Sequence, residues 1–142
     1  MRRQQICLMA ACCVFSVSQS LAQPIRAPSF PMDTPMRMRA IEAICTGVSE
    51  DSRNDPRWTN YRLRVEVVGA KGEYLGATRV TISKDGEALA SVDCGGPWVL
   101  FTLPAGAYSV TAEFAGASRT ARVNVAATGQ ARLILRFADS GK

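Results

Sequence analysis

The residues that decide the fold are 98–114, which read WVLFTLPAGAYSVTAEF. The first part, from Trp98 to Leu103, is almost entirely apolar, a pattern typical of a strand that is covered on both faces. Pro104-Ala105-Gly106 predicts a tight turn, because proline presets φ and glycine permits a positive φ. From Tyr108 onward, apolar residues alternate with polar ones, which predicts a second, half-buried strand.

The same two-residue period begins at Tyr61 and continues toward the C-terminus. Besides 98–103 and 108–114, it predicts strands at 61–67, 79–82, 87–93, 121–125 and 133–137. Turn residues separate these segments, and Asp85-Gly86 is a strong signal for a two-residue hairpin. Seven short strands at this spacing predict an all-β fold, a seven-stranded antiparallel β-sandwich over residues 61–138. A β-barrel is the alternative.

The segment before Tyr61 does not show this period. Residues 23–35 contain four prolines, which favours an extended arm. Thr34 as N-cap and Pro35 at the first helical position predict a short helix that ends near Gly47. Its apolar face would carry Met36, Ala40, Ile41, Ile44 and Val48. The polar stretch from Ser49 to Asn60 predicts a loop, so residues 23–60 are expected to hold a Pro-rich arm, a short helix and a polar loop.

The first 22 residues have the pattern of a secretory signal peptide. Arg2 and Arg3 form a positive start, residues 6–17 are apolar, and Ser20-Leu21-Ala22 predicts cleavage after Ala22. The apolar run is shorter than the roughly 20 residues of a membrane-spanning helix. We therefore expect a periplasmic protein without a transmembrane segment in its mature chain; a lipoprotein anchored at Cys12 and a secreted protein are the alternatives.

Cleavage after Ala22 would leave 120 of the 142 residues, a formal charge of +3 and two cysteines, Cys45 and Cys94. In an oxidising compartment we expect these two to form a disulfide. For a loop of about 50 residues, such a bond stabilises the fold by roughly 4 kcal/mol. Two separate buried thiols are the alternative.

Several stretches resemble one known family. The aromatic strand 98–101, the L-P-x-G-x-Y turn of 103–108 and the V-x-A strand 110–112 resemble the carboxypeptidase regulatory-like family. Gly72-Glu73-Tyr74-Leu75 and Gly96-Pro97-Trp98 are similar to motifs of a small exported proteobacterial subgroup. The resemblance implies a seven-stranded, transthyretin-like sandwich. It implies little about function, because the members of this subgroup are mostly uncharacterised.

Catalysis is disfavoured by the composition. The chain has no histidine, which excludes Ser-His-Asp and Cys-His mechanisms. It also excludes the hydroxyisourate hydrolases, whose transthyretin-like site needs histidines. The acidic residues are scattered: Glu66 and Glu73 flank one turn, Asp85 and Glu87 another, and we expect them to be solvated. We therefore expect no enzymatic activity and no cofactor.

A methionine cluster suggests a metal-binding alternative. Met32, Met36 and Met38 lie close together near the mature N-terminus. Thioether sulfurs select Cu(I), so a periplasmic copper carrier is the second hypothesis. The competing interpretation is that Met36 packs on a helical face and the other two lie in the arm.

A binding or structural module is the principal hypothesis. Trp58 in the polar loop, Trp98 beside Gly95-Gly96-Pro97, and Tyr74 are the candidate contact aromatics. Core packing is the alternative for Trp98. The arginines alternate along strands instead of clustering, so we expect no nucleic-acid binding. The expected partner is an unidentified protein or polysaccharide of the cell envelope, with attraction to anionic envelope polymers or lipid headgroups as a further option.

Overall fold

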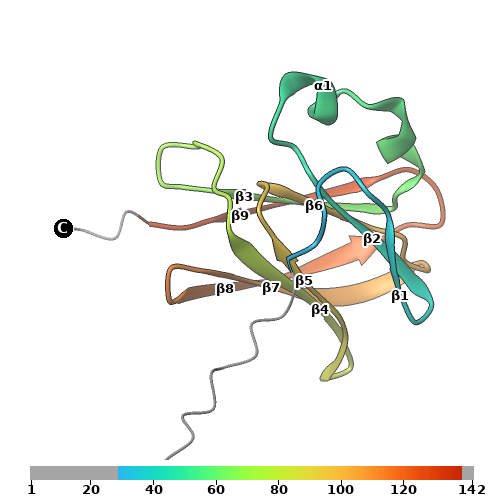
Figure 1. The fold of residues 1–142 in the computed structure, drawn as a ribbon. Helices are drawn as coiled ribbons and strands as arrows, with labels where there is room; N and C mark the ends of the chain where they lie inside the picture. The colour runs from blue at the N-terminus through green and yellow to red at the C-terminus, as the bar shows by residue number, and fades with distance from the viewer. Residues whose placement is uncertain (1–28, 139–142) are drawn as a thin grey trace, which may run out of the picture.

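The computed structural model describes residues 29–138. They form two β-sheets that pack as layers (Figure 1), so the expected all-β sandwich is confirmed. The strands number nine instead of seven: β1 (Met36–Met38), β2 (Ile41–Thr46), β3 (Leu63–Val68), β4 (Thr78–Lys84), β5 (Glu87–Cys94), β6 (Trp98–Phe101), β7 (Gly106–Phe114), β8 (Ala117–Val125) and β9 (Ala131–Arg136). The predicted signal peptide, residues 1–22, lies outside the described residues.

The seven predicted strands are β3 to β9, but one pairing differs from the expected antiparallel arrangement. One sheet has the order β1-β2-β6-β3-β9 and the other β5-β4-β7-β8. All neighbours are antiparallel except β3 and β9, which run parallel and side by side (Figure 1). The prediction of a wholly antiparallel sandwich was wrong here, because a two-residue period is the same for a strand running in either direction.

The predicted helix between Thr34 and Gly47 is also wrong. Its residues form the β1–β2 hairpin, with Arg39 at a φ of 56° in the turn. β2 pairs with β6, which places Ala43 opposite Phe101 and Cys45 opposite Val99. A short apolar run suits a helix or a buried strand equally well, and pairing with β6 decides in favour of the strand. The sandwich therefore begins well before Tyr61.

The predicted polar loop contains two short helices, α1 (Glu50–Arg53) and the 3₁₀-helix η1 (Pro56–Asn60). α1 starts at a capping box, in which the side chains of Ser49 and Ser52 accept from each other's backbone N–H groups. Asp55 caps η1 by accepting from the Arg57 backbone N–H. The segment lies on the outer side of the five-stranded sheet (Figure 1), where Trp58 packs against Ile44 and Leu100.

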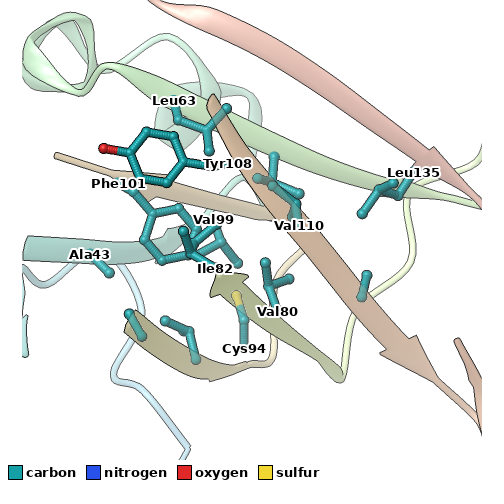
Figure 2. Close-up of a cluster of buried hydrophobic side chains, with 14 of the residues drawn as sticks. Ala43, Leu63, Val80, Ile82, Cys94, Val99, Phe101, Tyr108, Val110 and Leu135 are labelled. Carbon is teal, nitrogen blue, oxygen red and sulfur yellow. The ribbon is translucent and has the colours of Figure 1, made fainter. Parts of the chain in front are cut away.

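The main core lies between the sheets, as Figure 2 shows for Leu63, Val80, Val99 and other side chains. All four residues of β6 are buried, which confirms the prediction of a strand covered on both faces. The turn Pro104-Ala105-Gly106 that follows β6 has the expected positive φ at its glycine. Gly106 has a φ of 156°, and the buried Tyr108 donates its hydroxyl hydrogen to the Pro104 carbonyl oxygen at 2.7 Å.

The expected disulfide is present and joins the two sheets. Cys45 lies on β2 and Cys94 at the end of β5, with their Cα atoms 5.4 Å apart. The segment before β1 also contacts this region, because the Phe30 N–H donates to the Asp93 carbonyl and the Asp33 N–H donates to the Cys45 carbonyl. The bond therefore adds a covalent link between the two layers.

Replacing both cysteines, Cys45→Ala/Cys94→Ala, is expected to lower the free energy of unfolding by about 4 kcal/mol, because the unfolded chain regains the freedom of a long loop. Urea unfolding measures this change, and reductant should lower the stability of the wild type but not that of the double variant. Two reactive thiols in a denatured, unreduced chain of residues 23–142 would contradict the bond.

Candidate functional site

The candidate site lies on the outer face of the five-stranded sheet. Alternate residues of β3, β6 and β9 face away from the core there, and the register places Glu66 opposite Trp98 on one side and Ile134 on the other. We call the following set the aromatic–arginine surface: Arg53, Arg64, Glu66, Tyr74, Trp98, Arg132, Ile134 and Arg136.

Glu66 is the buried centre of this surface. Its side chain is only 1% exposed. Arg132 donates to it from Nε and Nη2 in a bidentate pair at 2.7 and 2.8 Å. Arg64 Nε lies 2.9 Å from Oε1 as a second ion pair. The hydrogen bonds and charge of Glu66 raise the pKa of Arg132. Two guanidinium groups share one carboxylate, so a positive charge remains in excess.

Aromatic rings extend the cluster toward α1. The Arg64 guanidinium lies over the Trp98 ring, 4.5 Å from its centroid. Tyr74 meets Trp98 edge to face with centroids 6.1 Å apart, and Arg53 lies 5.4 Å from the Tyr74 centroid. Arg53 is held in turn by donating to the Gly47 carbonyl at 2.9 Å. Cation–π and edge-to-face contacts of this kind are each favourable. Together they link Arg53, Tyr74, Trp98 and Arg64 in one continuous series of contacts.

Trp98 is buried, with 6% of its surface exposed, whereas Tyr74 is exposed. A Cβ on Gly47 would lie 2.7 Å from Trp98 Cγ, so only glycine allows the backbone to approach the indole this closely. Gly47 also has a φ of 93°, which side chains with a Cβ rarely adopt. Trp98 Nε1 is buried and has no hydrogen-bond partner among residues 29–138.

The loop between β3 and β4 presents Tyr74 to solvent. An isolated bridge joins Tyr74 to Val68, and Arg136 donates to the carbonyls of Gly69 and Ala70. Tyr74 remains 44% exposed, and Ile134 on β9 is 42% exposed. The surface thus combines accessible apolar area with arginines fixed by contacts to the protein.

The three candidate contact aromatics lie on the same outer face, but they differ in access. Tyr74 and Trp98 are in contact, and Trp58 lies in the same buried cluster as Trp98 and Leu100. Trp58 is 4% exposed, and its Nε1 donates to the Ser52 carbonyl at 2.6 Å. Trp58 therefore packs the α1–η1 segment onto the sheet, and only Tyr74 offers a ring to a ligand.

The methionines flank the inward-facing side of β2. Met32 bridges to Cys45, with its sulfur 3.3 Å from the Cys45 sulfur. Met36 and Met38 lie on β1 opposite Ala43 and Ile41. In the described part of the chain, no three His, Cys, Asp or Glu residues are grouped to hold a metal ion. Copper binding by the methionine sulfurs stays a prediction.

Sequence reasoning missed Arg64, Arg132 and Glu66 as site residues. It treated Glu66 as a solvated acid beside a turn, and that prediction was wrong because its side chain is 1% exposed and its carboxylate is paired with Arg64 and Arg132. The alternation of Arg64 and Glu66 with Leu63, Val65 and Val67 correctly places them outside the core. Their pairing with Arg132 depends on the parallel contact of β3 with β9.

The comparisons with known proteins do not identify a family. No family model matches the chain, and no curated protein matches it. A solved structure titled "The Bacillus anthracis TIE protein" is similar with a TM-score of 0.46 and 24% sequence identity. The similarity covers 56% of this chain and 16% of that one, so this chain spans a small part of its length. Within residues 29–138, no helix has the length and apolar character needed to cross a membrane.

Replacing the buried carboxylate, Glu66→Gln, is expected to lower the free energy of unfolding by about 1–3 kcal/mol, because Arg64 and Arg132 lose their counter-charge. Urea unfolding measures this change. Glu87→Gln is the matched control, since Glu87 is exposed in the β4–β5 hairpin. Equal stability of the Glu66→Gln variant and the wild type would show that the ion pairs contribute no net stability.

Alkaline pH tests a second contact on this face. Burial raises the pKa of Tyr61, and so does its hydrogen bond of 2.6 Å to the Glu42 carboxylate. Above the unfolded tyrosine pKa of about 10, the unfolded chain loses a proton that the native state retains, so stability falls as pH rises. Urea unfolding at increasing pH measures this effect: the free energy of unfolding should fall less steeply with pH in Tyr61→Phe than in the wild type. The same dependence on pH in both proteins would contradict this assignment.

Proposed function

We propose that this chain is an exported, non-catalytic β-sandwich protein of the carboxypeptidase regulatory-like, transthyretin-like type. We further propose that it binds an anionic polysaccharide of the cell envelope through the aromatic–arginine surface. The signal-peptide pattern of residues 1–22 supports export to the periplasm. The L-P-x-G-x-Y turn and the two-sheet sandwich support the family type.

The charge of the surface is the observation that carries the binding proposal. Arg53, Arg64, Arg132 and Arg136 carry four positive charges, and Glu66 is the only acid in the set. The nearby Glu73 carboxylate turns back toward its own loop, where it accepts from the Lys71 N–H. Arginine binds carboxylate and phosphate groups through paired hydrogen bonds. An acidic polymer therefore meets a surplus of positive charge on this face.

The exposed apolar area favours a polymer whose acidic groups are attached to sugar rings. Tyr74 and Ile134 together offer an accessible ring and an aliphatic side chain beside the arginines. Pyranose rings present C–H groups that pack on such surfaces, while their acidic groups reach the guanidinium groups. Aromatic side chains on loops of a rigid scaffold are common at binding sites. The combination suits a uronate-bearing polysaccharide better than a neutral one.

The arginines are also held before any ligand arrives. Glu66 fixes Arg132 and Arg64, and backbone carbonyls fix Arg53 and Arg136. Side chains that are already ordered lose little conformational freedom on binding. A polymer that repeats its acidic group can gain further affinity by engaging several copies of such a weak site.

Binding of the purified mature protein to polygalacturonate and to neutral dextran tests the proposal. Affinity electrophoresis should show retardation by polygalacturonate alone, weakening as salt increases. Tyr74→Ala and Arg136→Gln should each weaken binding about fivefold, equivalent to roughly 1 kcal/mol. Arg122→Gln is the matched control, because it removes the same charge from an exposed position on β8 in the other sheet.

Equal retardation by dextran, or retardation that Tyr74→Ala and Arg136→Gln leave unchanged, would overturn the proposal. An equal loss in Arg122→Gln would show that net charge, and not this surface, attracts the polymer. Circular dichroism of each variant separates lost binding from lost folding.

A further inference from the structure

A short segment before β1 connects the two sheets beside the disulfide. We call residues 29–33 the N-terminal strap, which Figure 1 shows in blue at the start of the described chain. Its Phe30 N–H donates to the Asp93 carbonyl of β5 at 2.9 Å. Its Asp33 N–H donates to the Cys45 carbonyl of β2 at 2.8 Å. The strap therefore contacts both strands that carry the disulfide, and it shares no residue with the aromatic–arginine surface.

Met32 places a thioether sulfur in the middle of this contact. The sulfur lies 3.3 Å from the Cys45 sulfur, and a parallel bridge pairs the two residues. A Cβ on Gly96 would lie 2.7 Å from Met32 Cε, so the methyl group lies directly against the Gly96 backbone. Met32 is thus held between the disulfide and the turn that follows β5.

The disulfide is enclosed, whereas Met32 is partly accessible. Cys45 is 0% exposed and Cys94 is 2% exposed. Met32 is a partly buried side chain that packs against the core around them. Oxidants modify methionine according to its access to solvent. Met32 is therefore the accessible sulfur beside a bond that is closed to solvent.

The strap is held by local contacts that can open separately from the sandwich. The buried Thr46 hydroxyl donates to the Asp33 carboxylate, and Phe30 and Met32 pack against the core. Asp33 has a φ of 56°, in the left-handed region that residues other than glycine rarely adopt. Segments with few buried contacts open at a lower free energy than the whole fold. A chemical change at Met32 can therefore release the strap while the sandwich stays folded.

We propose that Met32 is an oxidation site for peroxides and that its oxidation gives thiols access to the Cys45–Cys94 disulfide. The Met32 sulfur takes one oxygen atom from hydrogen peroxide and releases water; the sulfur loses two electrons and the peroxide gains them. The sulfoxide is polar and bulkier, and the 3.3 Å contact with the Cys45 sulfur leaves no room for it, so the strap detaches. A thiolate then attacks the disulfide and forms a mixed disulfide, and a second thiol completes the reduction to two cysteine thiols.

Reduction of the disulfide before and after peroxide treatment tests the proposal in a chain of residues 23–142. Peptide mass spectrometry should find a sulfoxide at Met32 after limited treatment with hydrogen peroxide. Dithiothreitol should then reduce the disulfide about tenfold faster than in the untreated chain, because the strap no longer covers it. Met32→Gln has a polar side chain in place of the thioether and should show the same acceleration without peroxide.

Two leucine variants identify the sulfur that is responsible. Met32→Leu keeps an apolar side chain of similar size that peroxide does not oxidise. Its disulfide should therefore react at the same rate before and after peroxide treatment. Met36→Leu is the matched control, because it removes an oxidisable sulfur from the exposed strand β1. Met36→Leu should be accelerated by peroxide as much as the wild type.

Amide hydrogen exchange separates release of the strap from unfolding of the whole chain. The N–H groups of Phe30 and Asp33 should exchange faster after oxidation, while the core strands β6 and β7 keep their protection. An equal loss of protection in β6 and β7 would overturn the proposal, because it indicates general destabilisation. So would an unoxidised Met32, an unchanged reduction rate after its oxidation, or the same acceleration in Met32→Leu.

Discussion

β6 runs through the middle of the five-stranded sheet, and its four residues are buried although they point alternately to opposite sides. Val99 and Phe101 enter the core between the sheets, whereas Trp98 and Leu100 face the outer side. A large apolar area on the outer side must be shielded from water. The α1–η1 segment provides this cover through Trp58, and Tyr74 extends it over Trp98. The outer face is therefore a second, smaller core instead of a solvated sheet surface.

This second core explains why arginines gather where they do. Glu66 is buried on the same face between Trp98 of β6 and Ile134 of β9, and a buried carboxylate is stable only with counter-charges and hydrogen bonds. Arg132 provides both, Arg64 provides a second counter-charge, and the Trp98 ring provides a further favourable contact for Arg64. Because Arg132 and Arg136 remain partly in water, the same pairs that stabilise Glu66 leave positive charge at the surface. The proposed binding surface is thus a consequence of how the sheet is covered.

The proposed binding surface belongs to a rigid framework. The aromatic–arginine surface lies on the outer face of the five-stranded sheet. The Cys45–Cys94 bond joins β2 of the first sheet to β5 of the second.

The sequence by itself determined the seven strands from β3 to β9, the Asp85-Gly86 hairpin and the double burial of β6. These features follow from local properties: a two-residue period, glycine and proline in turns, and an uninterrupted apolar run. The pairing of Cys45 with Cys94 followed from the expected oxidising compartment and from the two cysteines that remain after the predicted signal peptide. Only the tertiary structure decided that 36–46 is a hairpin, that β9 lies parallel to β3, and that Glu66 is buried between Arg64 and Arg132. Each of these depends on which strand or loop packs beside a segment, and the period of a single segment does not contain that information.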